Sequence, residues 1–199
     1  MAIKGVNLPR FQGGAMLVEV LIASVLGLTV IGMIVGIFLS GYRIASNRTL
    51  ELLTLQNLTI TTQMMRSDIQ RAGYSGGLGH SLTLLDESEI IAVSGSSIGF
   101  VYFDPHSALF QHVKYKLLGN QLYTCEKKSA AIQSFSSLSR CHHLFDQNML
   151  VVPSFAVSTV PLSSSSAQSA MIHFYLEAEL RDGRFNHSVS MSVKQRNWQ

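Results

Sequence analysis

The chain has 199 residues, which is room for one modest domain and an anchor but too little for a second enzymatic core. Hydrophobic residues make up 47% of it and charged residues only 14%, so we expect the apolar excess to be gathered in one segment. The net charge of +3 is small, and the basic residues are scattered apart from the pair Lys127-Lys128, so we predict no nucleic-acid binding by the isolated chain.

The chain starts with a short polar leader that precedes an apolar run. Residues 1–14 carry Lys4 and Arg10 and end at Gly13-Gly14. From Val20 to Leu39 the chain has twenty residues without a charge. A helix of that length spans about 30 Å, the thickness of the hydrocarbon core of a bilayer. The run has no polar stripe, which favours a membrane helix over a buried helix of a soluble protein, and we predict a transmembrane helix over residues 15–39.

The order of these two parts is the reverse of that in a secretory signal, whose apolar stretch precedes the cleavage site. Cleavage after Gly14 would leave the whole helix in place and create a new amine on Ala15. Glu19 lies at the start of the apolar run, where an acid costs about 2.5 to 3.5 kcal/mol and is usually retained for a partner. The amine of Ala15, in the same chain or an adjacent subunit, is such a partner. The alternative is an interfacial glutamate stabilised by the helix dipole.

A second helical pattern continues from the anchor without a proline. We predict an amphipathic helix over residues 40–73, because apolar side chains recur every three or four positions and polar ones lie elsewhere around it. Gly73 is the expected stop of the helix. The recurring positions are Leu52, Leu55, Leu58, Thr62, Met65, Ile69 and Ala72.

Beyond Gly77 the hydrophobic period shortens to two, which predicts β-strands and makes residues 74–199 a β-rich head. We expect an antiparallel sheet with one buried face, and therefore an α+β fold in which the long N-terminal helix packs on a small head. Residues 163–166 read as a loop, and turns are expected at residues 94–97, Gly119-Asn120 and Asp182-Gly183. The predicted strands cover residues 90–93, 98–103, 110–118, 121–125, 170–180 and 185–193.

Cys125 and Cys141 are the two cysteines of the chain, with fifteen residues between them. In a head outside the cytoplasm such a pair suggests a disulfide, which would contribute about 3 kcal/mol in the chain-entropy model. The alternative is a zinc site that also uses His142 and His143, but no C-x-x-C spacing supports it. We therefore predict a disulfide and no metal.

Residues 95–99 match G-x-S-x-G, the nucleophile elbow of hydrolases. That motif requires a strand before the serine and a helix after it, whereas an apolar strand follows here, so the segment reads as a turn. The remaining histidines and acidic residues assemble no acid, base and nucleophile. We predict that the chain is not an enzyme and uses no cofactor.

Gly14, Ala15 and Glu19, with the apolar residues between and after them, resemble the processing motif of type IV prepilins. That motif has glycine before the cut and glutamate at the fifth mature position. The resemblance implies that a membrane prepilin peptidase cleaves between Gly14 and Ala15 and N-methylates Ala15, and that Glu19 helps to fix axial register in a filament. One departure is Ala15 itself, because most members of the family begin the mature chain with Phe.

Two further stretches are similar to PilW-like minor pilins, namely residues 68–74 (DIQRAGY) and residues 194–197 (KQRN). The resemblance implies a pilin-like fold and a subunit that acts with other minor pilins, the major pilin and an inner-membrane assembly platform to prime pilus assembly. It also implies a place at the filament tip. The implied location is a single pass through the inner membrane with the head in the periplasm, and the pilus after assembly.

Two alternatives remain for the function. A minor pseudopilin of a type II secretion system would share the anchor and Glu19, and its partner subunits would distinguish it from a pilus protein. A membrane-tethered periplasmic binding module would keep its leader.

Overall fold

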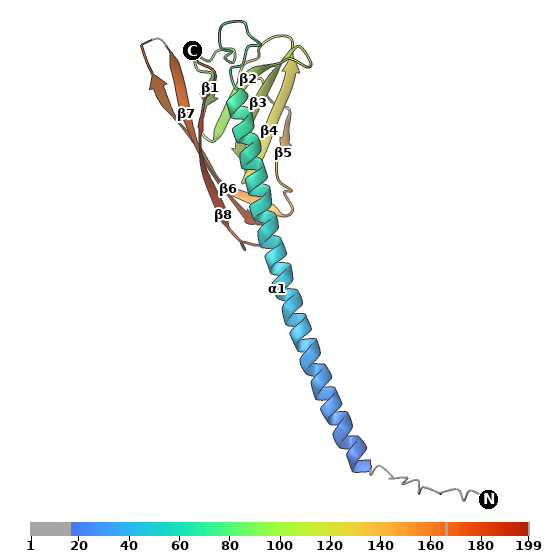
Figure 1. The fold of residues 1–199 in the computed structure, drawn as a ribbon. Coiled ribbons are helices and arrows are strands. Elements are labelled where there is room, and N and C mark those ends of the chain that lie inside the picture. The colour runs from blue at the N-terminus through green and yellow to red at the C-terminus, as the bar shows by residue number, and fades with distance from the viewer. Residues whose placement is uncertain (1–16, 166, 199) are drawn as a thin grey trace, which may run out of the picture. The chain divides into compact units, whose positions relative to one another are not determined.

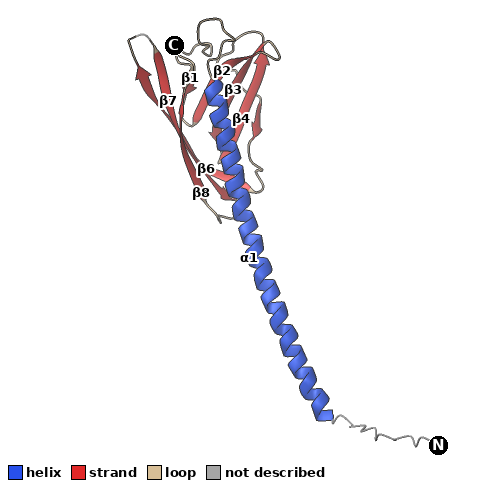
Figure 2. Ribbon diagram, in the orientation of Figure 1, coloured by secondary structure: helices blue, strands red, loops and turns tan. Residues whose placement is uncertain are grey.

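The computed structural model describes residues 17–165 and 167–198. One long helix is followed by eight strands (Figures 1 and 2). The chain divides into two compact units, Met1–Arg48 and Thr49–Gln199, which we describe separately. The elements are α1 (Leu17–Arg71), β1 (Ile91–Val93), β2 (Ser97–Asp104), β3 (Leu109–Leu118), β4 (Gln121–Ser129), β5 (Cys141–His143), β6 (Leu150–Ser163), β7 (Gln168–Leu180) and β8 (His187–Lys194).

In the first unit the described residues all belong to α1. An 18-residue window of this helix is apolar enough to cross a membrane, and none of that window is buried. The N-terminal transmembrane-like helix predicted from the uncharged run is therefore present. The cleavage positions Gly14 and Ala15 lie outside the described residues.

The second unit contains two antiparallel sheets and the C-terminal part of α1. β1 to β5 form one sheet in sequence order, and β6, β7 and β8 form the other. The sheets are connected where the Val152 N–H donates to the Asn120 carbonyl over 2.9 Å. A long N-terminal helix with an antiparallel β head confirms the α+β prediction, and the structure adds that the head has two sheets.

One core fills the space between the helix and the two sheets. The predicted alternation on β7 is confirmed, because Ala170, Ile172, Phe174, Leu176, Ala178 and Leu180 are all buried. The helix contributes Leu58, Met65 and Ile69 to the same cluster. Leu52, which the sequence pattern placed on this face, is 64% exposed, because six residues turn the helix by about 120° from the direction of Leu58. A second cluster, around Val101 and Cys125, covers the other face of the five-stranded sheet.

The hairpin turns follow their sequence signals to different degrees. Leu118 pairs with Gln121, so Gly119 and Asn120 form the expected two-residue turn, both with φ of 57°. The turn after β7 is wider than predicted, because β8 begins at His187 and Phe185 lies outside the strand. The chain passes through left-handed backbone at Gly183 and again at Phe185, which displaces the start of pairing.

His112 on β3 is fully buried and joins two segments of the head. Its Nδ1 lies 3.0 Å from the carbonyl of Lys127, and its Nε2 accepts a hydrogen bond from the backbone N–H of Gln133 at 3.0 Å. These partners fit a neutral ring that carries its proton on Nδ1. Burial lowers the pKa of His112 below its usual value.

We expect acid to weaken the fold through His112. A lowered pKa means that the unfolded chain binds this proton more readily, so the free energy of unfolding falls as the pH drops below about 6.5. Urea unfolding of the full chain in neutral detergent at pH 7 and pH 5 measures the fall. His112→Gln should be less stable at pH 7 and lose less stability on acidification. His106→Gln, at an exposed histidine, is the matched control, and the prediction is wrong if the two variants have the same pH dependence.

Candidate functional site

The first unit presents an apolar surface with a single acid. Glu19 lies in the first turn of the described helix, and its neighbours Val18, Val20, Leu21 and Ile22 are each at least 57% exposed. Burying such a side chain is worth about 1.5 to 3 kcal/mol, so a whole helix of them requires lipid or other helices around it.

No cation of this unit is available to Glu19 among residues 17–48. The first basic residue after it is Arg43, and 24 positions along a helix separate the two by about 36 Å. In an apolar environment an unpaired carboxylate is strongly disfavoured, so Glu19 requires a partner from outside the described helix. The structure thus leaves open the role that the sequence pattern assigns to Glu19, because Ala15 is not described.

The glycines of α1 add open space to this surface. An added Cβ at Gly27, Gly32, Gly36 or Gly41 would have no neighbouring atom within 4 Å. Gly32 and Gly36 lie four residues apart on one side of the helix, the spacing that lets two membrane helices approach closely. The surface can therefore accept a tightly packed helix as well as lipid.

In the second unit, the stretch DIQRAGY joins the end of α1 to the five-stranded sheet. Asp68 is nearly buried and accepts a hydrogen bond from the Tyr115 hydroxyl on β3 at 2.5 Å. Burial and the nearby Asp68 carboxylate raise the pKa of Tyr115 well above its usual range, so the phenol remains protonated and donates. Arg71 forms an ion pair with Asp68 and lies over the Tyr102 ring, with 4.7 Å to the ring centroid.

Gly73 ends the helix and begins the connection to the strands. Its φ of +78° is left-handed, and a Cβ there would lie 2.7 Å from Cγ2 of Ile90, so glycine is required on both grounds. Its N–H donates to the Val101 carbonyl on β2. Asn197 then caps the helix, because its Nδ2 donates to the Ala72 carbonyl at 2.6 Å. Residues 68–74 and 194–197, the two stretches that resemble PilW-like minor pilins, therefore meet at the end of α1.

The cysteines form the predicted disulfide. Cys125 and Cys141 face each other as a β4–β5 pair, with 3.9 Å between their Cα atoms. Because both sulfurs are in the disulfide, the thiolates needed for the alternative zinc site are absent. His142 and His143 continue β5, and the described residues contain no cluster of three potential metal ligands.

The G-x-S-x-G match is a turn between two strands. Ser94 and Ser97 exchange backbone hydrogen bonds, of 2.9 and 3.1 Å, across the turn that contains Gly95 and Ser96. β2 begins at Ser97, where a nucleophile elbow would require a helix. Sequence reasoning correctly rejected this motif, but it missed the contact between Asp68 and Tyr115, whose partners are 47 residues apart.

The chain is similar to known proteins in two of three comparisons. A family model described as "Prepilin peptidase-dependent protein B" matches residues 47–195. No curated protein matches the chain significantly. Among solved structures, the chain is similar to a type IV-like pilin from Thermus thermophilus, with 11% sequence identity and a TM-score of 0.49. That match covers 71% of this chain and 96% of the other.

The family match covers about three quarters of the chain, including the helix end and both sheets, and it ends two residues before the helix cap at Asn197. It begins within α1 at residue 47, after the uncharged run of residues 20–39, so it does not bear on Gly14, Ala15 or Glu19. The chain belongs to the prepilin peptidase-dependent protein B family and is a protein of the type IV pilin family.

Proposed function

We propose that this chain is a minor pilin, a subunit that enters a complex of minor pilins and primes the assembly of a type IV pilus. The observation that carries the proposal is the pairing of two unlike parts. One is the exposed apolar part of α1, residues 17–48, with a single acid, Glu19, and the other is a head that has its own core. Such a subunit can exchange lipid for neighbouring helices without unfolding its head.

Glu19 supplies the specificity of this exchange. In a bundle of apolar helices the carboxylate would pair with the amine of Ala15 on the same or an adjacent subunit, which fixes the axial position of one helix against the next. Apolar contacts alone fix no axial register, because one turn of an apolar helix resembles another. The role is mechanical and requires no catalysis by this chain.

The proposed partners are a prepilin peptidase, other minor pilins, the major pilin and an inner-membrane assembly platform. The disulfide between Cys125 and Cys141 supports a head in the periplasm, since disulfides persist in oxidising compartments. A minor pseudopilin of a type II secretion system remains the second candidate, and cross-linking to pilins or to pseudopilins in cells separates the two.

Processing tests the proposal most directly. The mature protein should be lighter than the full chain by about 1.5 kDa, the mass of residues 1–14, and should carry one added methyl group on Ala15. Gly14→Ser should leave the leader in place, because serine is larger at the position before the cut. Intact mass spectrometry of protein from its own cells measures both.

Gly13→Ser is the matched control, since it makes the same change one residue earlier, and we expect normal cleavage there. A wild-type protein that retains its first fourteen residues would contradict the proposal and favour a membrane-tethered binding module.

A further inference from the structure

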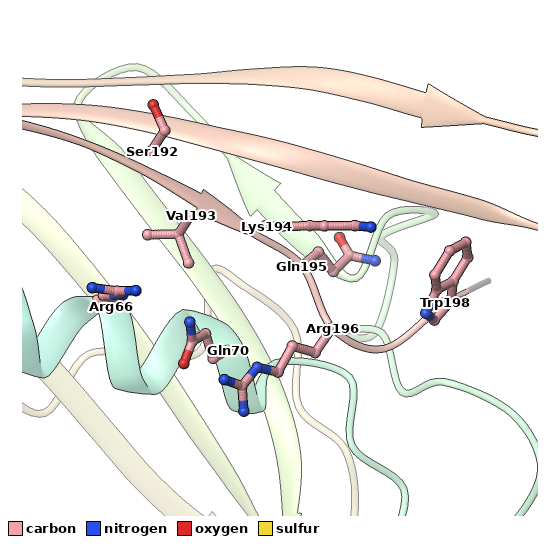
Figure 3. A pocket seen from close by; sticks show the side chains of 8 residues that line it. All are labelled: Arg66, Gln70, Ser192, Val193, Lys194, Gln195, Arg196 and Trp198. Atoms are coloured by element: carbon pink, nitrogen blue, oxygen red, sulfur yellow. The ribbon is translucent and has the colours of Figure 1, made fainter.

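A cationic pocket lies where the end of α1 meets the C-terminal segment of the second unit. It has a volume of about 390 Å³. Figure 3 shows Arg66 and Gln70 on the helix and Arg196 extending toward them from the segment after β8. Lys194 points the other way, toward Trp198, with its Nζ 5.1 Å from the ring centroid. We name this site the Arg66–Arg196 pocket; its lining is Arg66, Gln70, Ser192, Val193, Lys194, Gln195, Arg196 and Trp198.

The three cations of the pocket have no acidic partner in the part of the chain that the structure describes. No carboxylate there lies within ion-pair distance of Arg66, Lys194 or Arg196. By contrast, Arg71, Lys128 and Arg184 of the same unit are each paired with an aspartate. Like charges gathered in one place repel one another, so the cluster weakens the fold slightly unless an anion binds it.

Three hydrogen bonds hold the segment that carries Arg196 and Trp198. The Gln195 N–H donates to the Ala170 carbonyl at 2.9 Å, and Asn197 is bonded to the end of α1. The Trp198 carbonyl accepts a hydrogen bond from Ser81. Arg196 and Trp198 therefore project from a fixed backbone, so less entropy is lost when a ligand orders them.

We propose that the Arg66–Arg196 pocket binds an acidic segment of a partner polypeptide, with a Glu or Asp carboxylate between the two guanidinium groups. Two guanidinium forks match the geometry of carboxylates. Trp198, which is 53% exposed, offers an apolar surface to a neighbouring side chain of the segment. Arginine and tryptophan are also the residues that contribute most at protein interfaces. This assignment rests on the proposed function, for which it names the chemistry of a partner subunit.

A polypeptide fits the site better than a nucleic acid does. The pocket has room for a few side chains, whereas tracking a phosphate backbone requires an extended basic stripe. Once the leader's Lys4 and Arg10 are removed, 13 basic residues face 12 acidic ones, which leaves little long-range attraction for a polyanion.

Trp198 provides the measurement, because it is the single tryptophan of the chain. The full chain in neutral detergent is titrated with a blocked pentapeptide that has two glutamates around a leucine, and with its twin that has glutamines. Inorganic phosphate and a short single-stranded oligonucleotide are titrated alongside. We expect Trp198 fluorescence to change saturably with the glutamate peptide and not with its twin.

The double variant Arg66→Gln/Arg196→Gln should weaken binding of the glutamate peptide by at least about tenfold. Arg140→Gln, at an exposed arginine outside the pocket, should leave binding unchanged. Circular dichroism checks that each variant is folded, and if the double variant is not, each single variant should weaken binding by about threefold.

Three results would overturn the proposal. In the first, the two peptides bind equally well or neither binds. In the second, the arginine variants do not weaken binding of the glutamate peptide. In the third, phosphate or the oligonucleotide binds more tightly than the glutamate peptide. The measurement needs neither processing nor filament assembly. If the glutamate peptide binds but the protein in cells keeps its leader, the proposed function is wrong and the peptide site stands. If the leader is removed in cells but the peptide does not bind, only the peptide site is wrong.

Discussion

Replacing Glu19 by valine is expected to lower the number of filaments per cell by at least about tenfold while leaving the head folded. Valine removes the charge that pairs with the amine of Ala15. It also stabilises the anchor in the bilayer, because an acid within the membrane costs about 2.5 to 3.5 kcal/mol and valine removes that cost. Both effects hold the subunit in the bilayer. No described residue of the first unit belongs to the hydrophobic core of the head, so the fold of residues 49–198 should not change.

Electron microscopy counts the filaments, and immunoblotting of membranes measures recovery of the subunit. Glu89→Val is the matched control, because Glu89 is an exposed acid of the head, and it should give normal filament numbers. Normal filament numbers and normal recovery in Glu19→Val would contradict the role of this carboxylate.

Asp68→Ala should lower the free energy of unfolding of the head by about 3 kcal/mol and its melting temperature by about 10 °C. The substitution leaves the fully buried Tyr115 hydroxyl without its acceptor, which is the larger part of the loss. The Arg71 side chain is 53% exposed, so its lost ion pair contributes little after screening. Urea and thermal unfolding of the full chain in neutral detergent measure both quantities.

A double-mutant cycle isolates the contact itself. Tyr115→Phe should cost about 1.5 kcal/mol, and the pair should be coupled by at least about 1 kcal/mol. Glu89→Ala, at an exposed acid, should remain within about 0.5 kcal/mol of wild type. Losses that simply add in the double variant would show that Asp68 and Tyr115 do not act through their hydrogen bond.

The elements with a strong local signal were predicted correctly. The long helix, the two-residue turn at Gly119-Asn120 and the alternation of β7 each follow from residues close together in sequence. The sequence pattern did not predict β6, although β6 (Leu150–Ser163) is the longest of the described strands. It contains Pro153 and Pro161, which argue against a strand, and it tolerates them because it is an edge of its sheet. β5 has three residues, too few to show a period.

The candidate sites divide in the same way. Glu19 could be selected from the sequence, because one acid at the start of an uncharged run stands out by local composition alone. The cysteine pair was equally visible, and its disulfide is present. The Arg66–Arg196 pocket was not predicted, because its members lie 130 residues apart and no local pattern connects them.

The sequence by itself determined the anchor, the long helix and the α+β class, since each depends on hydrophobic periodicity that neighbouring residues impose. It also pointed to DIQRAGY and KQRN without showing what they do. Only the tertiary structure decided that the strands divide into two sheets, that Asp68 binds Tyr115 and that Asn197 caps α1. These features depend on which distant side chains share one core and satisfy each other's hydrogen bonds, and no local pattern encodes that pairing.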